Sequence, residues 1–316
     1  MPFWRQASET EKQQRERQAA SLKALEMGEI PPAARHRLEA QRLGGNRFFT
    51  SDLTTNEYLL TRSAGYEPIG LVMGTAFYKV SFWGYFSNYQ NFTGELSALS
   101  QAQLAARELA VSRLQQEAVL LGASGVIGVR LQVGGYDWSS RTIEFTAIGT
   151  AIRVKNRVPD REPFTSDLSG QEFWQLHQAG YWPKGLVFGV CSYYVHSDNQ
   201  TRSVRNNSWW SGGWANQELT QYTQGFQSAR HLAMNRLSQD IRRHQAEGAV
   251  GMKIDAAIED IEYEINDTKY HDLLAHFVAV GTSIVDDDQP TQTHLKSPLL
   301  FYDLATGKSE QLKVEQ

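Results

Sequence analysis

Cysteine is almost absent from this chain of 316 residues, because Cys191 is the only one. A disulfide within the chain and a cysteine-based zinc cluster are therefore excluded. Long apolar runs are also missing: none approaches the roughly 18 residues that indicate a transmembrane helix. The N-terminal stretch lacks the apolar core of a secretory signal. Together these absences predict a cytoplasmic protein.

Neither sign of charge dominates, since the formal net charge is only −4 at pH 7. This near balance argues against a nucleic-acid partner and against an acidic tail. The sequence also contains no nucleophile elbow, zinc-protease motif, P-loop or dinucleotide fingerprint. We therefore predict a protein that is not an enzyme and has no catalytic residue and no cofactor.

An internal duplication is the main feature that is present. Residues 49–80 align without a gap with residues 164–195, and half of the aligned positions are identical. The phrase FTSDL opens both copies, at Phe49 and Phe164. Later parts of the copies match after two shifts of register, both in polar or loop-like stretches. The duplication therefore spans both halves of the chain.

Each copy begins with a capping signature for a short helix. Thr54 and Glu57 have the spacing of a capping box, and so do Ser169 and Glu172. Each of these helices is expected to end at a glycine, Gly65 or Gly180.

The other polar residues that keep their identity between the copies include Asp52 and Asp167, and Arg107 and Arg230. We interpret all four as structural. The aspartates are expected in turns that lead into the caps. The arginines are expected in salt bridges between subunits or between helix and sheet.

The order of patterns in each copy predicts helix, strand, helix, strand, strand. The long helix is expected over about 95–121, with alanines at helical spacing that allow close packing on a sheet. Gly70 and Gly74 interrupt the first strand pattern and indicate a bulge or a close backbone approach. The predicted fold class is α+β, with a long helix on an antiparallel sheet in each copy.

Four segments follow from these patterns. We expect a charged, helical N-terminal arm over 1–46, a first domain over 47–157, a second over 158–286, and a tail with a hairpin over 287–316. Two prolines are expected to break the arm into two helices.

A family resemblance rests on the C-terminal part of the first copy. Residues 106–110 read ARELA, residues 122–129 read GASGVIGV, and residues 149–152 read GTAI. In this pattern the chain resembles the YbjQ-like family, whose label is heavy-metal binding, and two such domains would follow each other in tandem. The resemblance implies small α+β subunits that assemble into pentameric rings through their sheets. Five chains of this length would then form two stacked five-domain rings.

The metal implied by that label has weak support in the residues. The histidines are scattered, and the copies share none of them. His271 and His276 are the weak candidates, yet residues five apart on a strand point to opposite faces. We keep the binding of a metal or small ligand, in a stress-related protein, as the alternative to our main prediction.

Aromatic side chains crowd two inserts, residues 81–92 and 196–217. Such clusters are typical of oligomer interfaces, of surfaces that contact a partner protein or a membrane, and of cages for small molecules. The candidate contact residues are Trp83, Tyr85, Phe86, Tyr89, Trp209, Trp210 and Trp214. We predict a ring-forming homo-oligomeric binding or scaffold protein whose inserts make assembly or partner contacts.

Overall fold

The structure is a computed structural model. It describes residues 9–44, 50–79, 92–134, 142–155, 157, 162–205, 217–265, 268–287, 301–303 and 308–310.

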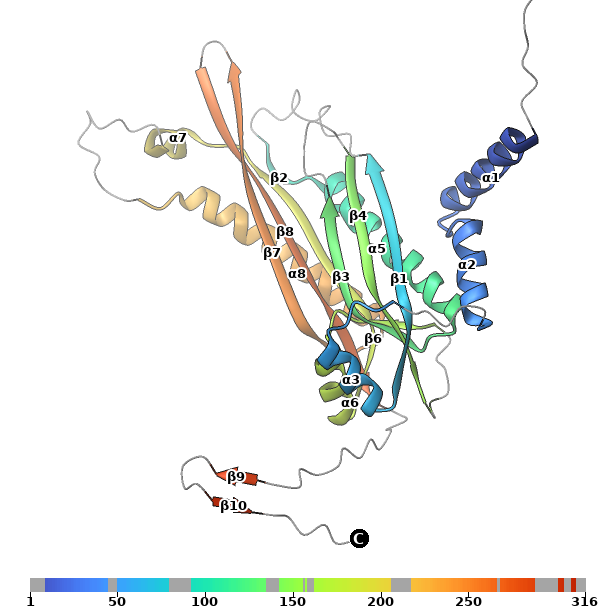
Figure 1. Cartoon of the computed structure of the whole chain (residues 1–316). Coiled ribbons are helices and arrows are strands. Elements are labelled where there is room, and N and C mark those ends of the chain that lie inside the picture. Colours follow the sequence, from blue (N-terminus) through green and yellow to red (C-terminus); the bar gives the residue numbers. More distant parts are fainter. Residues whose placement is uncertain are drawn as a thin grey trace, which may run out of the picture.

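The two copies fold into the same series of elements, as the duplication predicted (Figure 1). In the first copy these are α3 (Thr55–Ser63), β1 (Tyr66–Lys79), α5 (Ser97–Leu121), β3 (Gly125–Gly134) and β4 (Thr142–Val154). In the second they are α6 (Gly170–Gln178), β6 (Tyr181–Val195), α8 (Thr220–Arg243), β7 (Gly248–Ile265) and β8 (Thr268–Asp286). The other elements are α1 (Glu9–Glu26), α2 (Pro32–Arg42), β2 (Thr93–Glu95), β5 (Phe164–Thr165), α7 (Asn199–Arg205), β9 (Phe301–Asp303) and β10 (Lys308–Glu310).

Both predicted capping boxes are confirmed. The Thr54 hydroxyl accepts from the Glu57 amide at the start of α3, and the Glu57 carboxylate accepts from the Thr54 amide. Ser169 and Glu172 make the same reciprocal pair at α6. The glycines that follow these helices have φ of +86° at Gly65 and +84° at Gly180, a conformation that L side chains rarely adopt.

Two four-stranded sheets form the body of the protein. The first sheet has the order β1-β4-β3-β5, and the second has the order β2-β6-β8-β7. Three strands of each belong to one copy and pair antiparallel, which confirms the expected α+β fold. The fourth strand comes from the other copy: β5 joins β3 in parallel, and β2 joins β6 antiparallel. This exchange of strands was not predicted from the sequence.

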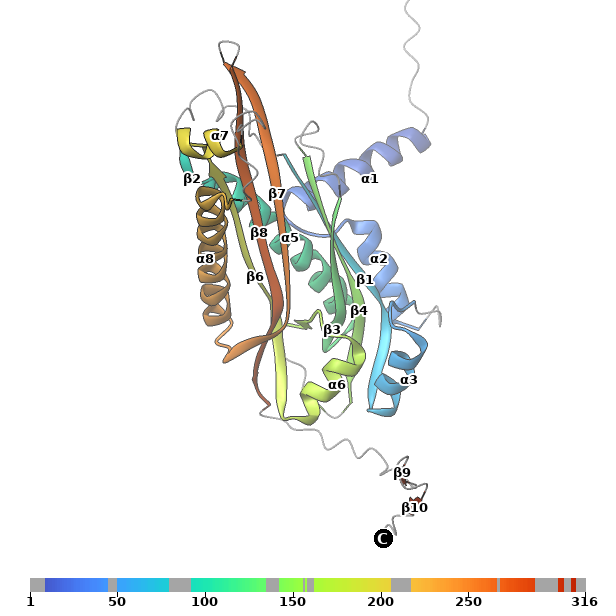
Figure 2. The ribbon, with the colours of Figure 1, turned by 90° about the vertical axis from the view of Figure 1, so that its left-hand side faces the viewer.

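The long helices and the sheets alternate in four layers. Figure 2 shows α8, the second sheet, α5 and the first sheet in that order. One continuous core joins α5 to both sheets, because it contains Leu114 of α5, Val72 and Phe145 of the first sheet, and Phe188 and Leu274 of the second. The helix of the first copy is thus covered on both sides, whereas α8 packs on its own sheet only.

Small residues set the distance between each helix and its sheet. A Cβ atom on Gly74 would lie 1.9 Å from the carbonyl oxygen of Ala110 in α5. At the matched Gly189 it would lie 2.3 Å from the carbonyl oxygen of Ala233 in α8. The close approach predicted for Gly74 is confirmed, and the predicted bulge lies between Pro68 and Gly70.

The N-terminal arm packs on the first copy. Leu38 of α2 is buried in the core that surrounds α5, and the Ile30 amide donates to Gln116 Oε1 over 3.1 Å. Pro31 and Pro32 stand at the start of α2, as predicted. At the other end of the chain, β9 and β10 form the predicted hairpin. Among the helices that the structure describes, none has the length and hydropathy needed to span a bilayer.

Candidate functional site

The repeated FTSDL phrase anchors its loop to the sheet of its own copy. In the first copy the Asp52 amide donates to Thr150 Oγ1 over 3.0 Å, and Ser51 Oγ lies 3.2 Å from the same hydroxyl. In the second copy the Asp167 amide and the Ser166 hydroxyl contact Thr282 Oγ1 at 3.1 Å and 3.0 Å. The phrase is repeated because each copy docks this loop on the threonine of its last strand.

Each of these aspartates also contacts a basic residue at a matched position. Arg130 of β3 forms an ion pair with Asp52. Lys253 of β7 lies 3.1 Å from Asp167 Oδ2. The structural interpretation of both aspartates is consistent with these contacts. The basic partners were missed, although their matched positions in the two copies were a usable signal.

The contact between the copies is lined by polar side chains of α5. The Ser192 amide of β6 donates to Ser100 Oγ over 2.9 Å, and its carbonyl accepts from the Leu96 amide over 2.9 Å. Gln103 donates to Ser192 Oγ over 3.3 Å. These bonds hold the first turn of α5 against the second sheet.

A bidentate ion pair crosses the same contact. Arg236 of α8 donates through both terminal nitrogens to Glu95, with Nη2 to Oε2 at 2.9 Å, and also to the Val190 carbonyl over 2.7 Å. The hydrogen bonds that the guanidinium donates to Glu95 raise the pKa of Arg236. This pair was not predicted, because its partners are far apart in sequence.

Arg107 of α5 and the matched Arg230 of α8 have different surroundings. Arg107 is buried, and its guanidinium carbon lies 4.4 Å from the centre of the Phe145 ring. Arg230 is exposed on α8. Their proposed role in salt bridges stays a prediction.

A series of buried polar contacts joins the two copies through Tyr66 of β1 and His177 of α6. His177 Nε2 lies 3.0 Å from Asp287 Oδ2, and Arg157 Nη1 lies 2.7 Å from Asp287 Oδ1. The Arg157 guanidinium also lies 3.4 Å from the centre of the Trp182 ring. Tyr66 of the first copy bonds to His177 Nδ1. Burial lowers the pKa of His177 despite the opposing effect of Asp287.

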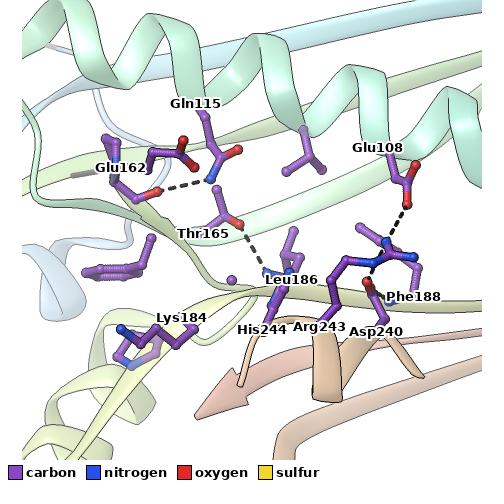
Figure 3. Close-up of a pocket in the computed structure, with 15 residues that line it drawn as sticks. Glu108, Gln115, Glu162, Thr165, Lys184, Leu186, Phe188, Asp240, Arg243 and His244 are labelled. Atoms are coloured by element: carbon purple, nitrogen blue, oxygen red, sulfur yellow. Dashed lines mark hydrogen bonds and ion pairs between the residues drawn. The ribbon is translucent and has the colours of Figure 1, made fainter. Parts of the chain in front are cut away.

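A pocket of about 570 Å³ opens between the two copies (Figure 3). Its walls come from α5, residues 162–165, β6 and the end of α8. The charged side chains in it largely pair with each other: Arg243 lies 3.2 Å from Asp240 and 3.6 Å from Glu108. Asp240 Oδ2 also accepts from the Phe188 amide over 3.0 Å.

The histidine that lines the pocket contacts a buried hydroxyl outside the pocket lining, but not in a catalytic relation. His244 Nδ1 lies 2.8 Å from Ser283 Oγ. The Ser283 hydroxyl donates to the Gly185 carbonyl over 2.8 Å, so His244 Nδ1 must donate to it. A histidine that donates to the hydroxyl is not placed to take its proton. The geometry therefore supports a structural role for this pair.

A second buried carboxylate holds the start of the segment that contains α7. Asp272 Oδ2 accepts from Tyr263 over 2.9 Å, lies 3.0 Å from His196 Nδ1 and also accepts from Tyr194. Asp272 Oδ1 accepts from the Ser197 amide over 2.9 Å. Burial is the main cause of the raised pKa values of both tyrosines. This cluster includes the first two residues of the second aromatic insert and was not predicted.

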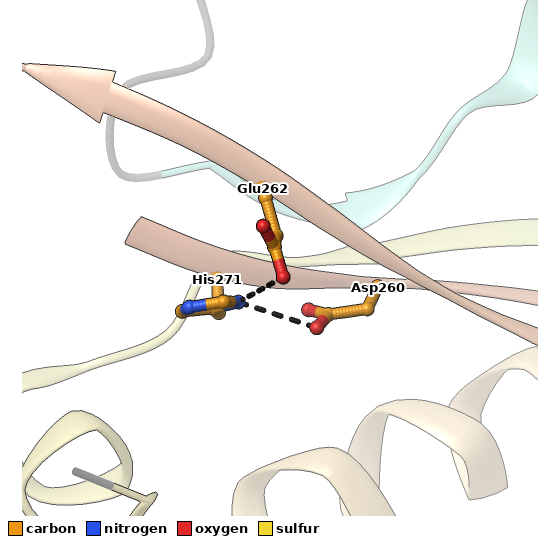
Figure 4. A group of neighbouring side chains, drawn as sticks. All are labelled: Asp260, Glu262 and His271. Atoms are coloured by element: carbon orange, nitrogen blue, oxygen red, sulfur yellow. Dashed lines mark hydrogen bonds and ion pairs between the residues drawn. The ribbon is translucent and has the colours of Figure 1, made fainter. Parts of the chain in front are cut away.

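One group of side chains has the composition of a metal site. Asp260, Glu262 and His271 of the β7–β8 hairpin place ligand atoms within 4.8 Å of one another (Figure 4). However, Arg205 donates to both carboxylate oxygens of Asp260. A cation at this place would have to displace a guanidinium, so these residues do not fit a preformed heavy-metal site.

The other metal candidates lie apart from this group. His276 is buried, and its Nδ1 lies 2.8 Å from Ser192 Oγ. Burial, with a further effect of Arg107, lowers the pKa of His276 to about 4. Burial raises the pKa of the Cys191 thiol to about 12, so it is not a thiolate at neutral pH. The structure does not bring His271 and His276 together.

The aromatic candidates fall outside the described residues. These are Trp83, Tyr85, Phe86, Tyr89, Trp209, Trp210 and Trp214. Their proposed role in contacts stays a prediction.

The outer faces of the two sheets differ in exposure although they derive from the same pattern. On the second sheet, α5 covers Leu186 and Phe188, which are each 4% exposed. The matched Leu71 and Met73 of the first sheet are 37% and 49% exposed, and Phe77 on the same face is 64% exposed. The first sheet therefore presents an open apolar face where the second sheet is covered by a helix.

Comparison with known proteins gives three findings. Residues 53–155 match the YbjQ-like family described as "Putative heavy-metal-binding". The chain is 34% identical over 252 residues to an encapsulin nanocompartment protein of Mycobacterium tuberculosis. This match covers 78% of the present chain and 90% of the mycobacterial protein. It is 31% identical over 107 residues to a UPF0145 protein of Enterococcus faecalis, covering 33% of this chain and 98% of that protein. No solved structure matches the chain.

Proposed function

The chain belongs to the YbjQ-like family, and on this premise we propose that it is a non-enzymatic scaffold protein that assembles with copies of itself. The observation that carries the proposal is the open face of the first sheet. Large apolar side chains at 37% to 64% exposure on one face are typical of an interaction surface. In the second sheet the same face is already covered by a helix.

The sequence duplication and the family resemblance define the proposed assembly in more detail. Two tandem modules, residues 47–157 and 158–286, are the building units, and five chains are the proposed number in a closed, cytoplasmic ring. Closing a ring would cover the open face in every copy. The name of the mycobacterial relative suggests a protein compartment as the setting, and the aromatic inserts are the proposed contacts with a partner.

Two of the described histidines support a non-enzymatic role. His244 donates to its neighbouring hydroxyl, and His276 is buried beside Ser192. Neither arrangement offers an accessible base next to a nucleophile.

The mass of the native chain in solution tests the proposal. Light scattering on the untagged protein is expected to give a multiple of the 35.7 kDa chain mass, with five chains as the proposed number. A mass near 35.7 kDa at every protein concentration would contradict self-assembly.

A small-ligand or metal-binding role is the second candidate, and the pocket between the copies favours it. Elemental analysis of the purified, untagged protein separates the metal part of this candidate from the scaffold role. We expect zinc, copper and nickel well below one atom per chain, because Arg205 occupies Asp260. Stoichiometric metal that is lost in His271→Ala would instead support a metal role for the hairpin group.

A further inference from the structure

We propose that the open face of the first sheet binds α8 of a second copy of this chain, in the way that the second sheet binds α5 within the chain. This inference rests on the proposed self-assembly and names the surfaces that carry it. The contact between the copies of the repeat is the template. Each of its parts has a counterpart, and the counterparts lie in the two outer layers of the fold, α8 and the first sheet (Figure 2).

The helices provide the first match. Ser100 and Val111 of α5 are buried against the second sheet. The matched Thr223 of α8 is exposed, and Met234 is only partly buried, because no sheet among the described residues covers this side of α8. The threonine keeps the hydroxyl through which Ser100 binds the sheet. The outer side of α8 therefore retains the polar and apolar pattern of a sheet-binding helix.

The segments that lead into the helices provide the second match. Gly94 of β2 stands opposite Tyr194 at the edge of the second sheet. The matched residues are Gln217 before α8 and Lys79 at the edge of the first sheet, and both are exposed. The residues directly before the two helices have nearly the same backbone, with φ and ψ of −84° and 77° before α5 and −83° and 77° before α8. Residues 217–218 are therefore shaped to extend β1 of a neighbour.

The third and most specific match is an ion pair that is formed within the chain and whose two matched residues would meet only between chains. Within the chain, Arg236 binds Glu95. The matched arginine is Arg113 of α5, which bonds to the Thr75 carbonyl as Arg236 bonds to Val190. In the described part of the chain, no carboxylate pairs with Arg113. Its Nη2 donates instead to the Leu25 carbonyl of the N-terminal arm over 2.9 Å.

Arg113 also retains an unused donor. It is only 9% exposed, and its Nε–H is buried without a hydrogen-bond partner among the described residues. Burial lowers the pKa of Arg113, whereas Glu95 raises that of Arg236. The matched carboxylate, Glu218, is exposed. A neighbour docked by the template places its Glu218 at this buried arginine.

The exchanged loop provides a fourth match. The FTSDL segment of the second copy bonds to β3, with the Ser166 amide donating to the Val126 carbonyl over 2.9 Å. A Cβ atom on Gly125 would overlap the Phe164 ring, at 2.2 Å. The matched Gly248 of β7 has open space around it, with no atom within 4 Å of such a Cβ. The start of β7 is thus an open place for the matched FTSDL loop of the next chain.

Charge agrees with this docking. Within the chain, the positive charge of Arg107 contributes to the lowered pKa of His276. The matched residues across the proposed contact are Arg230 and Glu144. They carry opposite charges, which favours their approach at the interface.

The proposed contact is directional, because α8 of one chain meets the first sheet of the next. Repetition of a contact of this kind closes a ring or extends without end. Both repeats of every chain then lie side by side in the same ring. Like-with-like stacked rings cannot use this contact, because α5 is already bound to the second sheet of its own chain.

Engineered cysteines at two exposed positions test the docking. Residues directly opposite in antiparallel strands have Cα atoms about 4.5 to 5.5 Å apart, within the range that a disulfide spans. We expect chains with Gln217→Cys mixed with chains with Lys79→Cys to form a disulfide-linked dimer under mild oxidation. Each single variant alone should stay uncrosslinked, since the native Cys191 is buried. The double variant should give a ladder of linked chains.

The outcomes separate this inference from the proposed function. If light scattering shows a multimer but the mixed variants do not crosslink, the docking is wrong and self-assembly stands. Crosslinks in the Gln217→Cys variant alone would indicate a symmetric contact and would also overturn the docking. If the wild-type chain is a monomer, the proposed function and this inference fail together.

Discussion

Replacement of Gly74 by alanine is expected to lower the free energy of unfolding by about 3 kcal/mol, near the upper end of the usual effect of overpacking. The new methyl group would lie 1.9 Å from the Ala110 carbonyl oxygen and 2.6 Å from the Leu114 nitrogen. Both atoms belong to the backbone of α5, so no side-chain rotation relieves the overlap. The helix has to move away from the sheet, and the small-residue packing along its length is lost. Urea unfolding at a fixed protein concentration measures the change.

Two further variants make this experiment specific. Gly189→Ala repeats the same clash in the second copy, where the Ala233 carbonyl oxygen lies 2.3 Å from the added atom. Glu67→Ala is the control, because Glu67 lies on the same strand as Gly74 but is exposed and makes only a surface ion pair. Its expected effect is below about 0.5 kcal/mol. An effect of Gly74→Ala as small as that of the control would show that the close packing of helix and sheet is wrong.

Acidification is expected to lower the free energy of unfolding through protonation of His276. Burial holds the pKa of this histidine at about 4, below the value of about 6.5 in an unfolded chain. The unfolded state therefore binds more protons than the folded state as the pH falls below about 6.5. Above about pH 6.5 this histidine does not lower the free energy of unfolding. The free energy of unfolding falls as the pH decreases from about 6.5 toward 4, and this effect levels off below about pH 4. The loss amounts to about 2 kcal/mol at pH 5.

The groups around His276 explain why it stays neutral. Burial and the positive charge of Arg107 in α5 both lower its pKa, and Glu259 of β7 lies 3.9 Å from its Nε2. The variant His276→Gln separates its effect from that of His177, which is buried, and His244, which is partly buried, since burial also lowers their pKa values.

The measurement is the free energy of unfolding at pH 7 and pH 5 for wild type and variant at the same protein concentration. The wild type is expected to lose about 2 kcal/mol more than His276→Gln between these two values. Equal losses in the two proteins would show that His276 is not desolvated in the folded state.

The local features of this protein follow from short stretches of sequence. The capping boxes at Thr54 and Ser169 begin helices because their partners are three residues away, and Gly65 and Gly180 end them. Hydrophobic periodicity predicted the long helix over about 95–121, and the structure has it at 97–121. The duplication predicted that both halves repeat one order of elements, because equal sequences favour equal local structures. The close approach at Gly74 was also readable, since glycine inside a strand pattern has few other causes.

Tertiary structure alone decided which matched residues are covered and which are open. Leu71 and Leu186 come from identical stretches, but only Leu186 lies beneath a helix. Arg107 is buried and Arg230 is exposed for the same reason. The exchange of β2 and β5 between the sheets and the pairing of Glu95 with Arg236 join segments far apart in the chain. Sequence patterns report the neighbours of a residue within a few positions, whereas burial depends on which distant surface packs against it.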